Sequence, residues 1–161
     1  MTDDLQLVRV TPERAGLVAP LFDAYRQFYG QAPDLEGARR FLSDRLERGE
    51  SDAFAVMERG HALGFTQLYP SFSSVAMKPL WVLNDLFVAE AARRRGVGAR
   101  LLLAARDHAV RTGAARLVLA TAVGNLPAQA LYDRLGWQKD TASVHYKFEL
   151  AVGSGPRSST Q

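Results

Sequence analysis

Residues 84–103 read NDLFVAEAARRRGVGARLLL, and this stretch sets the interpretation of the whole chain. An apolar strand is predicted over Leu83 to Val88, and three consecutive arginines follow it in a short loop. A helix is predicted directly after the loop because apolar residues recur there at helical spacing. These residues are Val97, Leu101, Leu102, Ala105 and Ala109. The order is therefore strand, basic glycine-containing loop, helix N-terminus.

This arrangement is typical of an anion-binding site. The first turn of a helix has backbone N–H groups without partners, and the helix dipole adds partial positive charge there. Gly96 and Gly98 allow close approach to the backbone. Arg93, Arg94 and Arg95 contribute full charges, so we expect a phosphate-bearing ligand. The alternative is an ordinary solvated turn.

Two common phosphate-binding motifs do not fit the loop. A Walker loop requires Gly-Lys-Ser/Thr, whereas this chain has Gly98-Ala99-Arg100. A dinucleotide fingerprint requires a third glycine, where Leu101 stands, and an acidic residue about 20 positions later. Residues 118–122 contain no acid. The loop keeps only the pattern R-x-x-G-x-G.

A second motif lies at residues 125–137, which read NLPAQALYDRLGW. On a helix, Asn125, Ala128 and Tyr132 fall on neighbouring turns of one face. Taken alone, a helix cap at Asn125 and a core tyrosine at Tyr132 explain this pattern. The two motifs in this order resemble the signatures of the GCN5-related N-acetyltransferase (GNAT) family, and the resemblance covers about residues 3–150.

The resemblance implies an α/β fold with a mixed, splayed sheet, and acetyl-CoA as the acetyl donor. Backbone groups of Leu86, Phe87 and Val88 would pair with the pantetheine arm like an added strand. The pyrophosphate would be held by Arg93, Arg94, Arg95, Gly96, Val97, Gly98 and Ala99. On the second helix, Asn125 and Ala128 would face the cofactor arm, and Tyr132 would lie near the sulfur and protonate the leaving thiolate.

The branch of the family and the acceptor are less closely specified. The run from Gln67 to Val88, with Tyr25 to Tyr29 upstream, resembles the branch of the fungal histone-and-other-protein acetyltransferases and their bacterial relatives. That branch acts on small amines, polyamines, amino acids or protein lysines. A small-molecule amine is the predicted acceptor. A CoA-binding sensor domain without catalysis is the alternative.

The general base is an open question in the sequence. Polyamine acetyltransferases commonly have Glu at the position of Asn84, and an amide cannot take a proton. Asp85 is the candidate base, with a purely structural carboxylate as the alternative, because a neighbouring residue on a regular strand points to the opposite face. Glu90, or a water chain to a distant acid, is the other option.

The expected order of elements is β-α-α-β-β-β-α-β-α-β-β in a single domain of residues 1–152, followed by a disordered tail at 153–161. Helices are expected from Thr11 to Phe28 and from Asp34 to about Gly49. Further strands are expected at 5–10, 53–57, 62–69 and 117–122, with a long loop at 70–79. A helix at 125–136 and a hairpin from 137 to 150 would end the domain.

Composition excludes several classes. The net charge is +3 and basic residues outside 93–95 are scattered among acids, which argues against nucleic-acid binding. There is no cysteine, and His61, His108 and His145 are not at metal-ligand spacing. No apolar run could cross a membrane and the first residues do not form a signal peptide, so the cytoplasm is the predicted location. A homodimer is a possible assembly.

Overall fold

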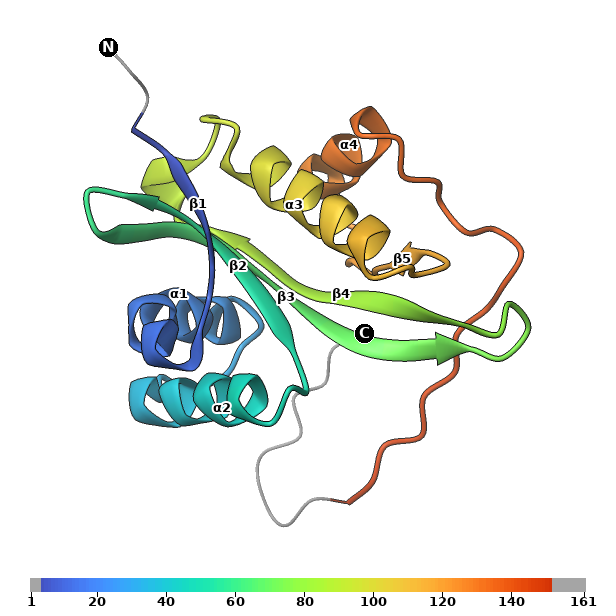
Figure 1. Cartoon of the computed structure of the whole chain (residues 1–161), viewed down its shortest axis with the longest axis horizontal. Coiled ribbons are helices and arrows are strands. Elements are labelled where there is room, and N and C mark those ends of the chain that lie inside the picture. Colours follow the sequence, from blue (N-terminus) through green and yellow to red (C-terminus); the bar gives the residue numbers. More distant parts are fainter. Residues whose placement is uncertain (1–3, 152–161) are drawn as a thin grey trace. The chain divides into compact units, whose positions relative to one another are not determined.

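The computed structural model describes residues 4–151. The chain forms two compact units, Met1–Ala120 and Thr121–Gln161. The first unit contains a five-stranded sheet in the order β1-β2-β3-β4-β5 (Figure 1). Its strands are β1 (Gln6–Arg9), β2 (Asp52–Glu58), β3 (His61–Ser73), β4 (Lys78–Val88) and β5 (Leu117–Val118). Neighbours are antiparallel except β4 and β5, which are parallel. The mixed α/β architecture predicted from the sequence is confirmed.

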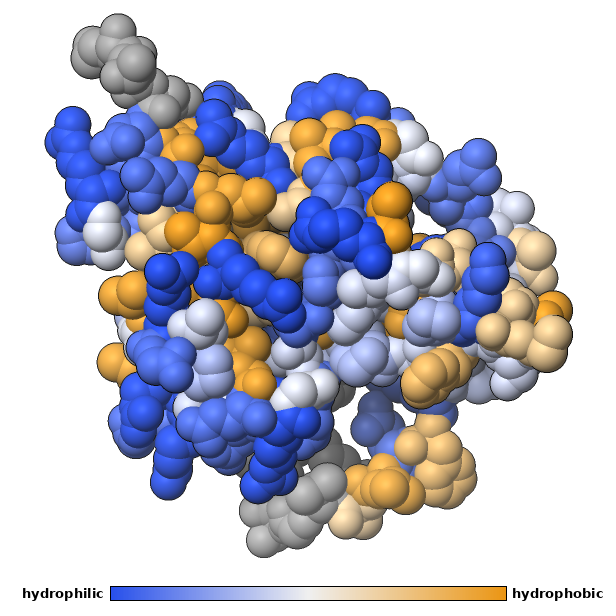
Figure 2. Space-filling model, in the orientation of Figure 1, coloured by the Kyte–Doolittle hydropathy of each residue, from blue (hydrophilic) through white to orange (hydrophobic). Residues whose placement is uncertain are grey.

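Helices cover both faces of this sheet. On one face lie α1 (Ala15–Phe28), which follows the short turn η1 (Pro12–Arg14), and α2 (Leu35–Glu47); on the other lies α3 (Val97–Arg111) (Figure 1). The predicted cap of α2 is confirmed, because the Asp34 carboxylate accepts a hydrogen bond from the Gly37 N–H at 2.9 Å. The outer face of α2 is hydrophilic in Figure 2, as its run of charged residues requires.

Strand β2 shows how the two layers share one sheet. Ala53, Ala55 and Met57 belong to the core cluster that also includes residues of α1 and α2. Phe54 alternates with them and its ring lies 5.4 Å from that of His108 in α3. Because both faces are covered, the strand reads as an almost continuous apolar run.

The interior face of α3 agrees with the predicted periodicity. Val97, Leu101, Leu102, Ala105 and Ala109 are all buried. Gly113 follows the helix with a φ of 69°, in the left-handed region that suits a helix C-terminus.

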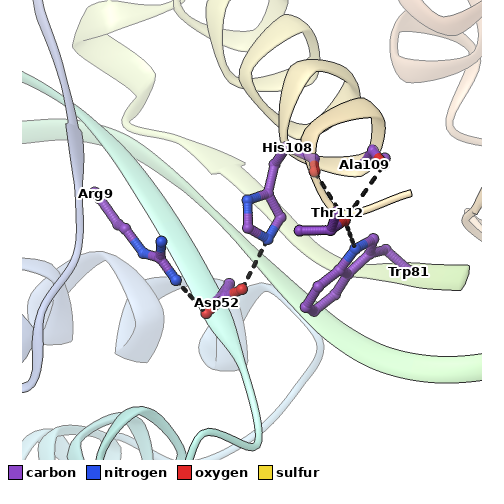
Figure 3. Close-up of polar contacts among 6 residues, drawn as sticks. All are labelled: Arg9, Asp52, Trp81, His108, Ala109 and Thr112. Atoms are coloured by element: carbon purple, nitrogen blue, oxygen red, sulfur yellow. Dashed lines mark hydrogen bonds and ion pairs between the residues drawn. The ribbon is translucent and has the colours of Figure 1, made fainter. Parts of the chain in front are cut away.

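A buried polar contact joins the far end of α3 to the sheet (Figure 3). The His108 Nε2 atom lies 2.7 Å from a carboxylate oxygen of Asp52 in β2, and Arg9 pairs with the other oxygen at 2.8 Å. The His108 ring also lies 4.9 Å from the ring of Trp81 in β4. No local sequence pattern predicts this contact, since Arg9, Asp52 and His108 are far apart in the chain.

The predicted long loop at 70–79 is wrong. Strands β3 and β4 continue through it as a hairpin, in which Pro70 pairs with Trp81 and Ser73 with Lys78. Strand β2 pairs with β3 only as far as Leu68, so Pro70 lies on an open edge and its missing N–H costs no ladder hydrogen bond. A proline therefore did not end this strand.

The sheet opens between β4 and β5. The two strands pair only at Trp81–Leu117 and Val82–Val118, so β5 is shorter than the predicted strand at 117–122. Within the described part of the chain, the edge of β4 from Leu83 to Val88 has no neighbouring strand on this side. This is the splay that the resemblance implied.

The second unit contains the helix α4 (Leu126–Arg134), close to its predicted range. The hairpin predicted from 137 to 150 is not formed, because residues 137–151 have no strand. Alternate apolar residues of this segment are largely exposed, with Tyr146 at 93% and Phe148 at 89%, and Figure 2 shows apolar surface along it. An apolar alternation shows which face a strand would bury but not whether a partner strand is present. The tail predicted at 153–161 lies outside the described residues, and the single domain of 1–152 stays a prediction.

Candidate active site

A β-bulge in β4 determines where Asp85 lies. Gln67 pairs with Asp85 and Leu68 with Leu83, so Asn84 is an extra residue without an opposite partner. A bulge interrupts the regular alternation of side chains. The Asn84 amide therefore reaches its neighbour and donates a hydrogen bond to the Asp85 carboxylate at 2.8 Å. The contact forms although Asn84 is exposed and Asp85 is buried.

The Asp85 carboxylate lies in a buried polar cluster. Only 2% of Asp85 is exposed. The fully buried Gln67 amide donates to the carboxylate and also lies 3.2 Å from the Tyr69 hydroxyl. Burial raises the pKa of Asp85, while the hydrogen bonds from Gln67 and Asn84 act in the opposite direction. A raised pKa brings a carboxyl group closer to the working range of a general base.

Two tyrosines border this carboxylate. The Tyr25 hydroxyl donates to the Asn84 carbonyl oxygen at 3.2 Å, and the Tyr25 ring lies 5.0 Å from that of Tyr29. Burial and then the nearby Asp85 charge raise the pKa of Tyr25, and the same causes raise the pKa of Tyr69 to about 12. Both phenols therefore keep their protons at neutral pH; the Tyr25 hydroxyl donates to the Asn84 carbonyl, whereas the Tyr69 oxygen accepts from the Gln67 amide.

The predicted anion site begins α3. Gly96 is the N-cap residue, with a φ of 77°, and a Cβ built there would meet nothing within 4 Å. The first hydrogen bond of the helix runs from the Arg100 N–H to the Gly96 carbonyl at 3.0 Å. The N–H groups of residues 97–99 consequently have no partner inside the helix. Arg93 ties the loop to the end of β4, because its Nε donates a hydrogen bond to the Val88 carbonyl oxygen at 3.3 Å.

Gly64 in β3 lets this helix start close to the sheet. A Cβ at this position would lie 2.8 Å from Val97 Cγ1, 3.1 Å from the Phe87 carbonyl and 3.3 Å from Leu101 Cδ1. Only glycine fits such an approach without a shift of its neighbours. The position of the α3 N-terminus therefore depends on a residue 33 positions before Val97 in the chain.

The chemistry of these groups fits coenzyme A. Unpaired N–H groups, glycine and arginines suit a pyrophosphate. The open edge of β4 suits an extended arm that carries amides, since such an edge offers unpaired N–H and C=O groups. The residues predicted for the pantetheine arm, 86–88, and for the pyrophosphate, 93–99, are close together in the chain. Both ranges lie in the first unit.

The residues predicted on α4 lie in the second unit. The Asn125 side-chain oxygen accepts a hydrogen bond from the Ala128 N–H at 3.4 Å, so this residue caps the helix. Tyr132 is partly buried and its ring lies 6.0 Å from that of Trp137. The cap occupies the oxygen of the Asn125 amide and leaves its N–H₂ group as a donor.

The sequence interpretation missed three polar residues of these sites. Gln67 and Tyr69 face Asp85, and Glu58 pairs with Arg95 in the loop. Gln67 and Tyr69 lie in the run 67–88, but that run assigned them no role, because strand register and bulge position bring them to the site. Among residues 4–151, no group of three or more His, Cys, Asp or Glu side chains is placed to hold a metal ion. Likewise, none of the described helices is long and apolar enough to span a membrane.

Comparison with known proteins agrees with this geometry. The model of the acetyltransferase (GNAT) family matches residues 18–137. The uncharacterized N-acetyltransferase YhfO of Bacillus subtilis is 52% identical over 132 residues, which cover 82% of this chain and 89% of that protein. A crystal structure of a probable acetyltransferase is 41% identical, with a TM-score of 0.86 over 91% of this chain and 99% of that one.

The predicted branch of the family needs correction. Yeast D-amino-acid N-acetyltransferase HPA3 is 31% identical over 108 residues, covering 67% of this chain and 65% of that protein. The higher identities are to bacterial N-acetyltransferases rather than to fungal histone acetyltransferases. The family is therefore shown, whereas the resemblance of residues 67–88 to the fungal branch is not.

Proposed function

Since the chain belongs to the acetyltransferase (GNAT) family, we propose that it moves the acetyl group of acetyl-CoA directly to the primary amine of a small molecule. Members of this family use acetyl-CoA. The observation that carries the proposal is the open edge of β4, which runs from the buried Asp85 cluster to the arginine loop. One strand thus offers a site for the donor and a carboxylate for the acceptor. The amine acceptor is supported by the D-amino-acid substrate in the name of the yeast relative.

For the binding of acetyl-CoA, the proposal assigns roles to the residues of the two sequence motifs. The backbone of Leu86, Phe87 and Val88 pairs with the pantetheine arm, and residues 93–99 bind the pyrophosphate. Asn125 and Ala128 line the arm from α4. Tyr132 protonates the leaving thiolate; a phenol of pKa about 10 and a thiol of pKa about 8.5 are close enough for this transfer.

The acceptor side requires a proton acceptor. An alkyl amine of pKa about 10.4 must lose its proton to attack, which costs about 4.6 kcal/mol at pH 7. Asp85 is the proposed base, because its burial raises its pKa and favours uptake of a proton. The carboxylate is too buried for direct contact with a bulky amine, so the proton reaches it through a neighbour. Tyr25, which is half-buried and borders Asp85, is the proposed neighbour.

The test is acetyl-CoA turnover, measured as free thiol release, against polyamines, amino acids, aminoglycosides and a lysine-rich peptide. Release with one class of small amine is the expected result. Tyr132→Phe keeps the ring and removes the proton donor, and should lower kcat by roughly 10²- to 10⁴-fold. Tight CoA binding without release for any acceptor would favour a binding domain. Failure to bind CoA would overturn the proposal.

A further inference from the structure

The arginine loop is tied to a distant strand by an ion pair. Arg95 contacts the carboxylate of Glu58, the last residue of β2, through both of its terminal nitrogens, at 2.6 Å and 3.2 Å. About one third of each side chain is exposed, with 34% for Arg95 and 29% for Glu58. The hydrogen bond from Arg95 lowers the pKa of Glu58, so this carboxylate is charged at neutral pH.

The backbone of the same loop is in an unusual conformation. Arg94 has a φ of 64° and Gly96 a φ of 77°. For a residue with a Cβ, the left-handed region is unfavourable and persists only where the surroundings hold it. Two contacts flank Arg94 on either side: Arg93 to the Val88 carbonyl, and Arg95 to Glu58.

The three arginines therefore differ in role. Arg93 and Arg95 brace the loop against β4 and β2. The Arg94 side chain makes no hydrogen bond or ion pair with any residue in the described range 4–151. The braced conformation leaves this cation, together with the first-turn N–H groups of α3, for a ligand.

We propose that Glu58 is a positioning residue for the pyrophosphate of the donor, a role that rests on the proposed function. A carboxylate near a pyrophosphate site should repel the ligand unless a cation neutralises its charge. Here the two-point pair with Arg95 neutralises Glu58 and fixes a loop conformation that is unfavourable by itself. Bidentate arginine–carboxylate pairs have this geometric specificity. The loop is thus preorganised before the donor binds.

Glu58→Gln tests the role. It removes the charge while keeping the size of the side chain. CoA affinity measured by calorimetry, and KM for acetyl-CoA, should both weaken by about three- to tenfold, with kcat unchanged. With acetyl-pantetheine, which lacks the pyrophosphate, the variant and the wild type should have equal KM values. Glu50→Gln is the matched control, because Glu50 pairs with Arg45 at 3.4 Å and lies outside the loop.

Three results would contradict the inference. Unchanged or tighter CoA binding by Glu58→Gln would mean that Glu58 only withdraws positive charge from the loop. An equal rise in KM for both donors would indicate a general structural effect. Wild-type protein that binds no CoA would overturn the proposed function itself, and the positioning role with it. The two failures are distinguishable, because this one is seen in the wild type alone.

Discussion

The arginine loop and the Asp85 cluster are the two parts of the proposed site, and they are built in opposite ways. The loop consists of the consecutive residues 93–99, and most of its side chains are exposed. The cluster draws Tyr25 from α1 and both Gln67 and Tyr69 from β3 around a carboxylate that is 2% exposed. The loop can therefore be recognised as a sequence motif, whereas the cluster forms only when α1 and strands β3 and β4 are in place. Changes in the two parts should have different signatures in kinetics and stability.

The largest expected effect comes from the buried cluster. Asp85→Asn should lower kcat by roughly 10²- to 10⁴-fold, the usual contribution of a general base, with little change in CoA affinity. The rise of the rate toward alkaline pH should flatten. Initial rates across pH and calorimetry with CoA measure both effects. Asp52→Asn, which removes a carboxylate bonded to His108, serves as the control. An unaltered pH–rate profile in Asp85→Asn would show that the base is another group.

Gly64 packs against the start of α3, and its substitution should have an intermediate effect on both stability and CoA affinity. Gly64→Ala places a Cβ 2.8 Å from Val97 Cγ1 and should cost about 1–3 kcal/mol of unfolding free energy, as overpacked cores do. CoA affinity should also fall because the α3 N-terminus is displaced. Urea denaturation and calorimetry are the measurements. Gly16→Ala in α1 is the control, since a Cβ there meets nothing within 4 Å. Equal stability of Gly64→Ala and wild type would show that α3 adjusts freely.

The smallest expected effect is a difference in how stability depends on pH. Burial raises the pKa of Asp85, so the folded state holds this proton more tightly than the unfolded state does. Stability from this group is present below the unfolded pKa and is lost as pH rises through the folded pKa. Asp85→Asn should therefore gain stability relative to wild type as pH rises above the unfolded pKa of about 3.9, measured by urea denaturation.

The pKa of Asp23 is shifted in the opposite direction, so the same denaturation experiment should give the opposite pH dependence of stability. The Asp34 N–H hydrogen bond, followed by Arg26 and Gln27, lowers the pKa of this buried carboxylate against the effect of burial. Its stabilisation is present above the unfolded pKa and is lost as pH falls through the folded pKa. Asp23→Asn should consequently lose most stability at neutral pH. Parallel slopes for the two variants would refute the assignment of opposite shifts.

The fold was largely predictable because local patterns and tertiary structure agree in most elements. The apolar spacing of α3, the Asp34 cap of α2 and the glycines after the helices all hold in the structure. Prediction failed where an edge or a partner strand decides the outcome. Pro70 is accommodated on an open edge of β3, and the apolar alternation of 144–150 found no strand to pair with.

The sequence by itself determined most of the elements, the glycine loop that begins α3 and the family, because a helix start, a glycine loop and an apolar period are set by residues close together in the chain. Only the tertiary structure decided the surroundings of Asp85, since a one-residue bulge at Asn84 sets the register that pairs Asp85 with Gln67. The same holds for the pair of Glu58 and Arg95, which are 37 residues apart. Register and strand order brought these charges together, and no local pattern encodes either.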